Sequence, residues 1–377
     1  MKTSWNGGLS SLLALGLLLS CAPDSDHLPS APGPSITAHR AAAHWSPWSE
    51  PVNVGAPINS VGDDSQGTLS PSGLSLYFHS DRTDLAGAQG GNDIWVSRRA
   101  CRRCPWQTPV NLGSVINTSA NENAPTFSND ERLMFFVSNR AGGHGRADIY
   151  LSHRADPTND LGWETPENLG PDVNTADAEA SPAYLGKGTG GHAQLYFSRG
   201  VVMEQKADIF VASVTRRGVT LGPAVAVSEL NDPTVNDAGM TVRHDGKELI
   251  FWSNRDGADG NLFVSTRGSV RDRWSTPVKL PAPLNTEFGE INARLSKDGR
   301  TLLLTSTRPG GLGGTQFGFD IWMSTRTPSG DFDADGDDDD DHGSHGKPRQ
   351  RGQLDRPRGA QRPPARHCPA GGATFAR

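Results

Sequence analysis

The chain has 377 residues, with 36 Lys or Arg against 42 Asp or Glu, and a formal net charge of -6 at pH 7. This balance excludes nucleic-acid recognition through overall basic charge, and we expect no nucleic-acid partner. The 44 Gly and 27 Pro favour short strands joined by many turns. After the first 20 positions no long segment places apolar residues at helical spacing. The sequence therefore predicts an all-β fold.

Residues 1–20 are predicted to be an export signal that takes no part in the fold. Lys2 gives a positive start, and residues 12–19 form an apolar run that is too short to cross a bilayer, which takes about 20 residues. The run ends at Leu-Leu-Ser-Cys21, which resembles a bacterial lipobox, and this implies that Cys21 carries acyl chains such as palmitate. Because Ala22 follows, we expect an outer-membrane lipoprotein that faces the periplasm or the cell surface. An ordinary secreted protein with an incidental cysteine is the alternative.

Residues 21–45 are rich in Pro, Ser and Ala and lack a periodic apolar pattern, so we predict a flexible tether. Five repeats follow over residues 46–327. Each contains an aspartate or asparagine followed by an aliphatic and an aromatic residue, and the copies are 53 to 60 residues apart, which indicates a repeat architecture. The five copies begin at Asp93, Asp148, Asp208, Asn261 and Asp320.

Four strands are predicted in each repeat, in the first one over residues 68–70, 74–80, 93–98 and 106–112. The last of the four begins with a Trp-x-x-Pro pattern, and proline confines a strand to the edge of a sheet. The fifth repeat lacks this outer strand, whereas an unpaired copy, Trp48 to Gly55, precedes the first repeat. We predict a five-bladed β-propeller of four-stranded blades, closed by the N-terminal strand joining the last blade.

Residues 328–377 are predicted to be a disordered tail, first Asp-rich and then Arg/Pro-rich. Asp331, Asp333 and Asp335 with the following glycine match the start of a calcium loop. His342 stands where the bidentate Glu of such a loop is expected. Loose association with calcium is therefore all that this segment predicts.

Three features of the repeats together resemble the TolB-type, WD-like (PD-type) propeller repeat. They are turns such as Ser-Pro-Ser-Gly73, strand ends such as Ser-Asn-Arg140 and Ser-Asn-Arg255, and the Asp-Ile-aromatic starts. The resemblance covers the five repeats and implies the propeller fold. Relatives occur beside OmpA-like peptidoglycan-binding domains, in periplasmic TolB and as the propeller of prolyl oligopeptidase-like peptidases. This sequence has no Gly-x-Ser-x-Gly elbow, and the particular partners of TolB are not carried over.

An acidic residue stands five positions before the apolar residue of every first strand. That strand lines the channel of a propeller, so the five carboxylates would form a ring near a channel mouth. Such a ring could hold calcium or attract the cationic groups of a ligand. The alternative, which we favour because the acid occurs in every blade, is that each carboxylate accepts backbone hydrogen bonds within the blades. The five residues are Asp64, Glu122, Glu179, Asp237 and Glu290.

A second repeated pair, an arginine and an aspartate, flanks the turn between strands two and three. We expect these side chains to meet across the hairpin, since the forked donors of Arg match a carboxylate. In the fourth repeat Asn261 replaces the aspartate, so Arg255 is expected to lack that partner. The four pairs are Arg82 with Asp93, Arg140 with Asp148, Arg199 with Asp208, and Arg308 with Asp320.

Cys101 and Cys104 are predicted to form a local disulfide in an oxidising compartment. A lone Cys-x-x-Cys has no second pair to complete a zinc site. A redox-active pair is the alternative, since nearby arginines lower a thiol pKa, but no thioredoxin-like βαβ pattern accompanies it.

No catalytic constellation stands out from the repeated set. The histidines, among them His79, fall at strand ends or turns without metal-ligand spacing, and we expect them at the surface. We therefore predict a monomeric, non-enzymatic envelope lipoprotein without a cofactor, whose propeller binds another envelope protein or a saccharide. Two alternatives stay open. One is a glycan- or peptide-acting hydrolase that uses the channel carboxylates, and the other is a purely structural spacer.

Overall fold

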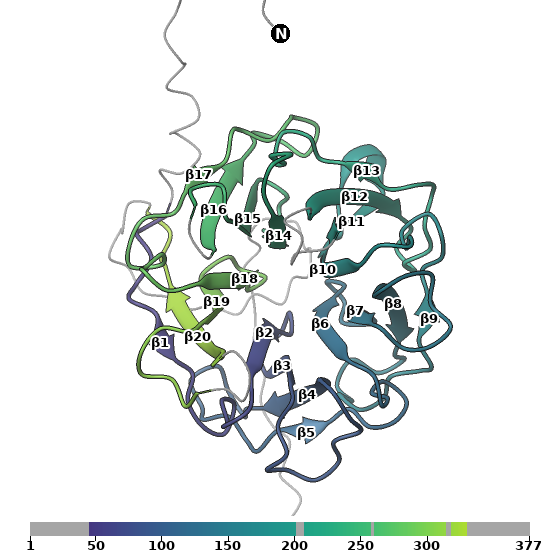
Figure 1. Cartoon of the computed structure of the whole chain (residues 1–377), viewed down its shortest axis with the longest axis vertical. Coiled ribbons are helices and arrows are strands. Elements are labelled where there is room, and N and C mark those ends of the chain that lie inside the picture. Colours follow the sequence, from purple (N-terminus) through teal and green to yellow (C-terminus); the bar gives the residue numbers. More distant parts are fainter. Residues whose placement is uncertain (1–44, 201–206, 258–259, 314–317, 330–377) are drawn as a thin grey trace, which may run out of the picture. The chain divides into compact units, whose positions relative to one another are not determined.

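The structure is a computed structural model that describes residues 45–200, 207–257, 260–313 and 318–329. Five four-stranded antiparallel sheets follow one another around a ring (Figure 1), which confirms the predicted all-β, five-bladed propeller. No helix in this part of the chain is long and apolar enough to cross a membrane. The predicted export signal, most of the tether and nearly all of the tail lie outside the described residues. Cys21, Asp331, Asp333 and Asp335 belong to those segments.

Each blade has an inner strand, two middle strands and a two-residue outer strand, hydrogen-bonded in that order. The first blade contains β2 (Asp64–Leu69), β3 (Ser75–Ser80), β4 (Asp93–Arg98) and β5 (Val110–Asn111). The second contains β6 (Glu122–Phe127), β7 (Leu133–Ser138), β8 (Asp148–His153) and β9 (Glu167–Asn168). The third contains β10 (Glu179–Leu185), β11 (Ala193–Arg199), β12 (Asp208–Val214) and β13 (Val225–Ala226), with a 3₁₀ turn at Thr189–Gly191. The fourth contains β14 (Asp237–Val242), β15 (Glu248–Ser253), β16 (Asn261–Thr266) and β17 (Val278–Lys279). The fifth contains β18 (Glu290–Leu295), β19 (Thr301–Ser306) and β20 (Asp320–Thr325), with β1 (Val52–Asn53) as its outer strand.

The ring closes through strand β1, as the sequence predicts. Val52 pairs with Met323 and Asn53 pairs with Trp322 in antiparallel register. The side chain of Asn53 also donates a hydrogen bond to Asp320 (2.8 Å). The N-terminal strand thus ties the last blade to the first and removes the open edge of the last sheet.

The inner strand of each blade begins earlier than predicted and contains a β-bulge. In the first blade Ser65 pairs with His79 and Thr68 pairs with Tyr77, so two residues of β2 oppose one residue of β3. The first bulged residue has left-handed backbone geometry in every blade. These residues are Gln66 (φ 52°), Ala124 (φ 55°), Ser181 (φ 51°), Gly239 (φ 57°) and Asn292 (φ 54°).

Hydrophobic side chains fill the space between successive blades. Along β3, Leu76 and Phe78 pack on residues of the fifth blade, whereas Tyr77 between them packs on residues of the second blade. This is the two-residue periodicity of a strand that is buried on both faces. Burying one such aromatic side chain contributes about 1.5–3 kcal/mol. The blades are therefore held together mainly by the apolar interfaces between them.

An arginine that follows the third strand stacks on a tryptophan in four blades, a contact that the sequence analysis did not predict. The guanidinium group lies over the face of the indole ring. Its Nε also donates a hydrogen bond to a backbone carbonyl of the turn between strands one and two. The third blade has Thr215 at this position. The stacked pairs are Arg99 on Trp106 (4.3 Å), Arg154 on Trp163 (4.4 Å), Arg267 on Trp274 (4.1 Å) and Arg326 on Trp48 (4.3 Å).

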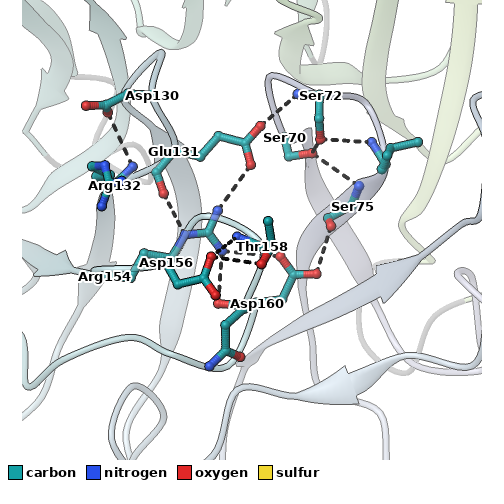
Figure 2. Close-up of polar contacts among 12 residues, drawn as sticks. Ser70, Ser72, Ser75, Asp130, Glu131, Arg132, Arg154, Asp156, Thr158 and Asp160 are labelled. Atoms are coloured by element: carbon teal, nitrogen blue, oxygen red, sulfur yellow. Dashed lines mark hydrogen bonds and ion pairs between the residues drawn. The ribbon is translucent and has the colours of Figure 1, made fainter.

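Glu131 fastens the second blade to the first (Figure 2). Its carboxylate accepts a hydrogen bond from the backbone N–H of Ser72 in the first blade (2.8 Å) and one from the buried Arg154 (3.2 Å). Arg154 also donates to Tyr77 of the first blade (3.0 Å) and to Asp160 (3.2 Å). Glu131 has a positive φ of 58°, and glycine occupies this turn position in three other blades, at Gly73, Gly246 and Gly299.

Substitutions at Glu131 should separate backbone strain from carboxylate contacts. We expect Glu131→Ala to destabilise the protein by about 1–3 kcal/mol, since buried Arg154 loses a charged partner. Glu131→Gly should lose the same contacts but recover about 1 kcal/mol, because glycine adopts a positive φ without strain. Urea unfolding of both variants measures the difference. A Glu131→Ala variant as stable as the wild type would show that the carboxylate contributes nothing.

Candidate functional site

The five repeated carboxylates lie inside their own blades and not on the channel surface, and each is 0% exposed. Glu122 shows the arrangement. Its carboxylate accepts hydrogen bonds from the backbone N–H (2.7 Å) and hydroxyl (2.9 Å) of Thr118, from the hydroxyl of Ser138 (2.7 Å) and from Arg140 (3.1 Å). This geometry agrees with the blade-building alternative and differs from a ring of carboxylates that faces the channel. The other members are Asp64, Glu179, Asp237 and Glu290.

The predicted arginine–aspartate pairs across the hairpin were wrong, because each arginine pairs with the carboxylate of the first strand. The same guanidinium group donates to a carbonyl of the loop that enters the blade, as Arg140 does to Ile116 (2.6 Å). It also lies over one or two aromatic rings of the middle strands, in this blade Phe136 and Tyr150. We call this arrangement the acid–arginine node. The pairs are Arg82 with Asp64 (3.5 Å), Arg140 with Glu122 (3.1 Å), Arg199 with Glu179 (2.8 Å), Arg255 with Asp237, and Arg308 with Glu290 (3.1 Å).

The aspartates of the third strand have another role. Asp93, Asp148 and Asp320 accept a hydrogen bond from an asparagine of the outer strand, for example Asn111 to Asp93 (3.0 Å). The fourth blade differs here. There Asp256 accepts from both Asn261 (2.8 Å) and Lys279 (2.6 Å). Arg255, which has Asn261 in place of that aspartate, pairs with Asp237 of its own first strand.

Within the described residues no group of three or more His, Cys, Asp or Glu side chains is arranged to hold a metal ion. Cys101 and Cys104 are joined in a disulfide within the loop between β4 and β5.

Burial makes Asp64, the carboxylate of the first node, a weaker acid than a free aspartate. Burial raises its pKa to about 6, although hydrogen bonds from Ser80 and Ser60 and the charge of Arg82 act in the opposite direction. The Asp64–Arg82 distance of 3.5 Å is longer than the 3.1 Å of the Glu122–Arg140 pair. The weaker ion pair compensates less of the desolvation cost.

The central channel, which the five inner strands surround, has two mouths (Figure 1). The first mouth lies where the inner strands begin and holds a cavity of 330 Å³. The bulged residues of four blades reach it, and polar side chains dominate its wall. They include Ser65, Gln66, Asn123, Ser181 and Asn292.

Two carboxylates at the first mouth depart from the repeat. Asp63 and Asp81 both line the cavity, and the backbone N–H of Asp63 donates to Oδ1 of Asp81 (2.7 Å). An amide oxygen is sufficient for the same bond in two other blades, so blade geometry does not require acids here. The corresponding bonds there are Asn121 to Asn139 (2.8 Å) and Asn236 to Asn254 (2.9 Å).

His79 and Asn123 also line this cavity. Nδ1 of His79 and Oδ1 of Asn123 are buried and have no hydrogen-bond partner within the described part of the chain. His79 itself is partly exposed and faces this cavity. Burial, and secondarily the charge of Arg294, lowers its pKa to about 3, so the imidazole is neutral at physiological pH. A ligand with hydroxyl groups could satisfy both atoms.

The second mouth lies where the inner strands end and holds a smaller cavity of 70 Å³. Arg294 of β18 lines it, where the other blades have Thr68, Thr126, Ala183 and Thr241. Sequence reasoning missed Asp63, Asp81 and Arg294. The available signal was their departure from the residues at the same positions of the other repeats.

Comparison with known proteins gives likenesses of fold only. No protein-family model matches the chain, and no curated protein matches it. Solved structures with a similar fold include the catalytic domain of a GH62 α-L-arabinofuranosidase from Coprinopsis cinerea, at 13% identity and a TM-score of 0.49 over 76% of this chain and 98% of that one. A thermostable family-43 glycoside hydrolase has 14% identity and a TM-score of 0.47 over 72% of this chain and 91% of that one. A putative TolB from Agrobacterium tumefaciens has 15% identity and a TM-score of 0.43 over 71% and 91%.

TolB proteins are among the solved structures of similar fold, and one prediction needs correction. We predicted from the absence of a catalytic motif that the protein is not an enzyme. Glycoside hydrolases are among the solved structures that share this architecture, so the motif argument does not exclude catalysis and the prediction is withdrawn. At these identities the comparisons assign neither an activity nor a ligand to this chain.

Replacing Asp64 by Asn should flatten the pH dependence of stability. Because the folded pKa of about 6 lies above the ordinary value of 3.8, the folded state binds this proton more tightly, and the contribution of Asp64 to stability is lost as pH rises through that window. The wild type should therefore lose up to about 3 kcal/mol relative to Asp64→Asn between pH 4 and pH 7. Urea unfolding of both proteins at each pH measures this. Parallel pH profiles would contradict it.

Proposed function

We propose that the protein binds a saccharide at the first mouth of the channel and hydrolyses a glycosidic bond there. One observation carries the proposal. Asp63 and Asp81 introduce a carboxylate pair at a polar cavity, at positions where asparagines serve the blade geometry elsewhere.

The wall of the cavity supports a saccharide as the ligand. Sugar hydroxyls both donate and accept hydrogen bonds, and the wall offers amide, hydroxyl and carboxylate groups together with the unpartnered atoms of His79 and Asn123. Its 330 Å³ falls within the usual range of small-molecule sites. The buried amide and imidazole give the site fixed acceptors and donors, which favours one orientation of the ligand.

The carboxylate pair supports hydrolysis as the reaction. Glycosidases commonly use two carboxyl groups, one that protonates the leaving oxygen and one that activates water or attacks the sugar carbon. The bond from the backbone of Asp63 to the side chain of Asp81 (2.7 Å) keeps the two residues together. Phe319 donates its backbone N–H to Asp63 (3.1 Å), which fixes the first carboxylate further.

Asparagine substitutions at these positions should remove activity and leave the fold intact. Asp63→Asn and Asp81→Asn restore the pair found in the second and fourth blades, so we expect a melting temperature near that of the wild type. Turnover on a panel of aryl glycosides and plant and bacterial polysaccharides should fall by about 10²–10⁴-fold.

The matched control is Asp177→Asn, since Asp177 is an exposed carboxylate two positions before the start of the third inner strand. Its turnover should equal that of the wild type. Hydrolysis would be overturned if the wild type turns over no glycoside of the panel, or if both asparagine variants keep full turnover. Binding without turnover, measured by calorimetry on the same saccharides, would retain the ligand and reject the reaction.

We also propose, from the sequence alone, that the propeller is held at a bacterial membrane by acyl chains on Cys21. In cells given a radioactive or alkyne-tagged palmitate, the wild type should carry the label and fractionate with membranes. Cys21→Ser should carry no label, and most of it should leave the membrane fraction, because the residue that holds the acyl chains is gone. Labelling of the Cys21→Ser variant would contradict the proposal, and Cys101→Ser with Cys104→Ser serves as the control.

A further inference from the structure

Arg294 places a buried positive charge in the channel wall, where the other blades have small side chains. It is the fifth residue of β18, and threonine or alanine stands at this position in β2, β6, β10 and β14. The side chain is 3% exposed. Burial lowers its pKa to about 10, so it stays protonated at neutral pH. A charge at such a position is costly unless it is paired.

Among the described residues, only one nitrogen of the guanidinium group has hydrogen-bond partners. Nη1 donates to the carbonyl oxygens of Met240 (2.7 Å) and Ala293 (3.2 Å). Nε and Nη2 are buried, and no described residue accepts a hydrogen bond from them. These two atoms form one edge of the planar guanidinium group, the edge that receives the two oxygens of a carboxylate in a forked pair.

The surroundings of that edge favour an anion. The cavity at the second mouth, which Arg294 lines, has no Asp or Glu among its lining residues, whereas His244 and Lys297 line it with Arg294. The hydroxyl-bearing Thr68, Thr126 and Thr241 complete the inner wall. Within the lining itself, therefore, no carboxylate offsets the charge of Arg294.

The size of the cavity restricts what it can take. A volume of 70 Å³ is small beside the roughly 300–1,000 Å³ of sites that hold drug-sized ligands. A carboxylate group matches this space better than a complete sugar ring does. Any larger ligand must therefore insert an acidic group and keep its remainder outside the mouth.

We propose that the second mouth of the channel is a carboxylate-binding site, in which the Nε–Nη2 edge of Arg294 holds the two oxygens of the ligand. Lys297 and His244 add positive charge along the path to it. The ligand class is a small organic acid or the carboxylate end of a longer chain. The site lies at the opposite mouth from Asp63 and Asp81, and it does not depend on the proposed hydrolysis.

Acetate is the minimal probe, compared with inorganic phosphate and with chloride at constant ionic strength. Acetate should raise the melting temperature of the wild type by mass action, and saturation-transfer NMR should give its Kd. Chloride should have a smaller effect, because a single atom cannot form the two parallel bonds that the two oxygens of a carboxylate form with the fork. Phosphate also pairs with the fork, but it is tetrahedral, so a site shaped for a planar carboxylate should bind it more weakly than acetate.

Arg294→Thr reproduces the residue of three other blades and should fold normally. In the absence of acetate it should be at least as stable as the wild type, since an uncompensated buried charge has been removed. Its affinity for acetate should fall by about 10- to 100-fold. Arg294→Lys keeps the charge and loses the fork, so its affinity should be intermediate. Arg300→Thr, an exposed arginine near the same mouth, should bind as the wild type does.

Three results would overturn the proposal. They are equal stabilisation of the wild type and Arg294→Thr by acetate, an effect of chloride or phosphate as large as that of acetate, and an Arg294→Thr variant less stable than the wild type without any anion. The last result would show that the guanidinium group already finds its partners within the protein.

Discussion

A carboxylate buried against an arginine, repeated once in each blade, is the constraint on which the rest of this propeller depends. The acid holds the loop that enters the blade, as Glu122 holds Thr118, and the arginine holds the carbonyl of the same loop and covers the aromatic rings of the middle strands. A buried ion pair adds little net stability compared with apolar packing, but the loss of one partner is expensive. The node therefore fixes where each inner strand begins, and with it the shape of the channel wall.

Functional information in such a repeat lies in the departures from it. The nodes explain the presence of Asp64, Glu122, Glu179, Asp237 and Glu290. They do not explain Asp63 and Asp81 at one mouth of the channel or Arg294 at the other. The two sets are of opposite charge and at opposite ends of the inner strands. A ligand with distinct ends would meet different chemistry at the two mouths.

The fold could be predicted from the sequence because its signals are local and repeated. The period gives the number of blades, proline before the outer strand marks the edge, and the unpaired copy at Trp48 gives the closure. The partner of each arginine could not be predicted in the same way, since Arg140 is near Asp148 in sequence yet meets Glu122 through the pairing of β6 with β7. Likewise the bulges, which decide which residues reach the channel, follow from strand register and not from composition. The charge of Arg294 was visible in the sequence, but its burial was not.

The bulge in every inner strand has a consequence for how this channel can change over evolutionary time. A bulged residue is released from the pairing ladder, and the five such positions hold five different amino acids: Gln66, Ala124, Ser181, Gly239 and Asn292. The acids two positions earlier keep the same chemistry in all five blades. The propeller thus separates a rigid frame from a set of interchangeable wall positions, so that a new ligand preference can arise at the mouth without rebuilding a blade.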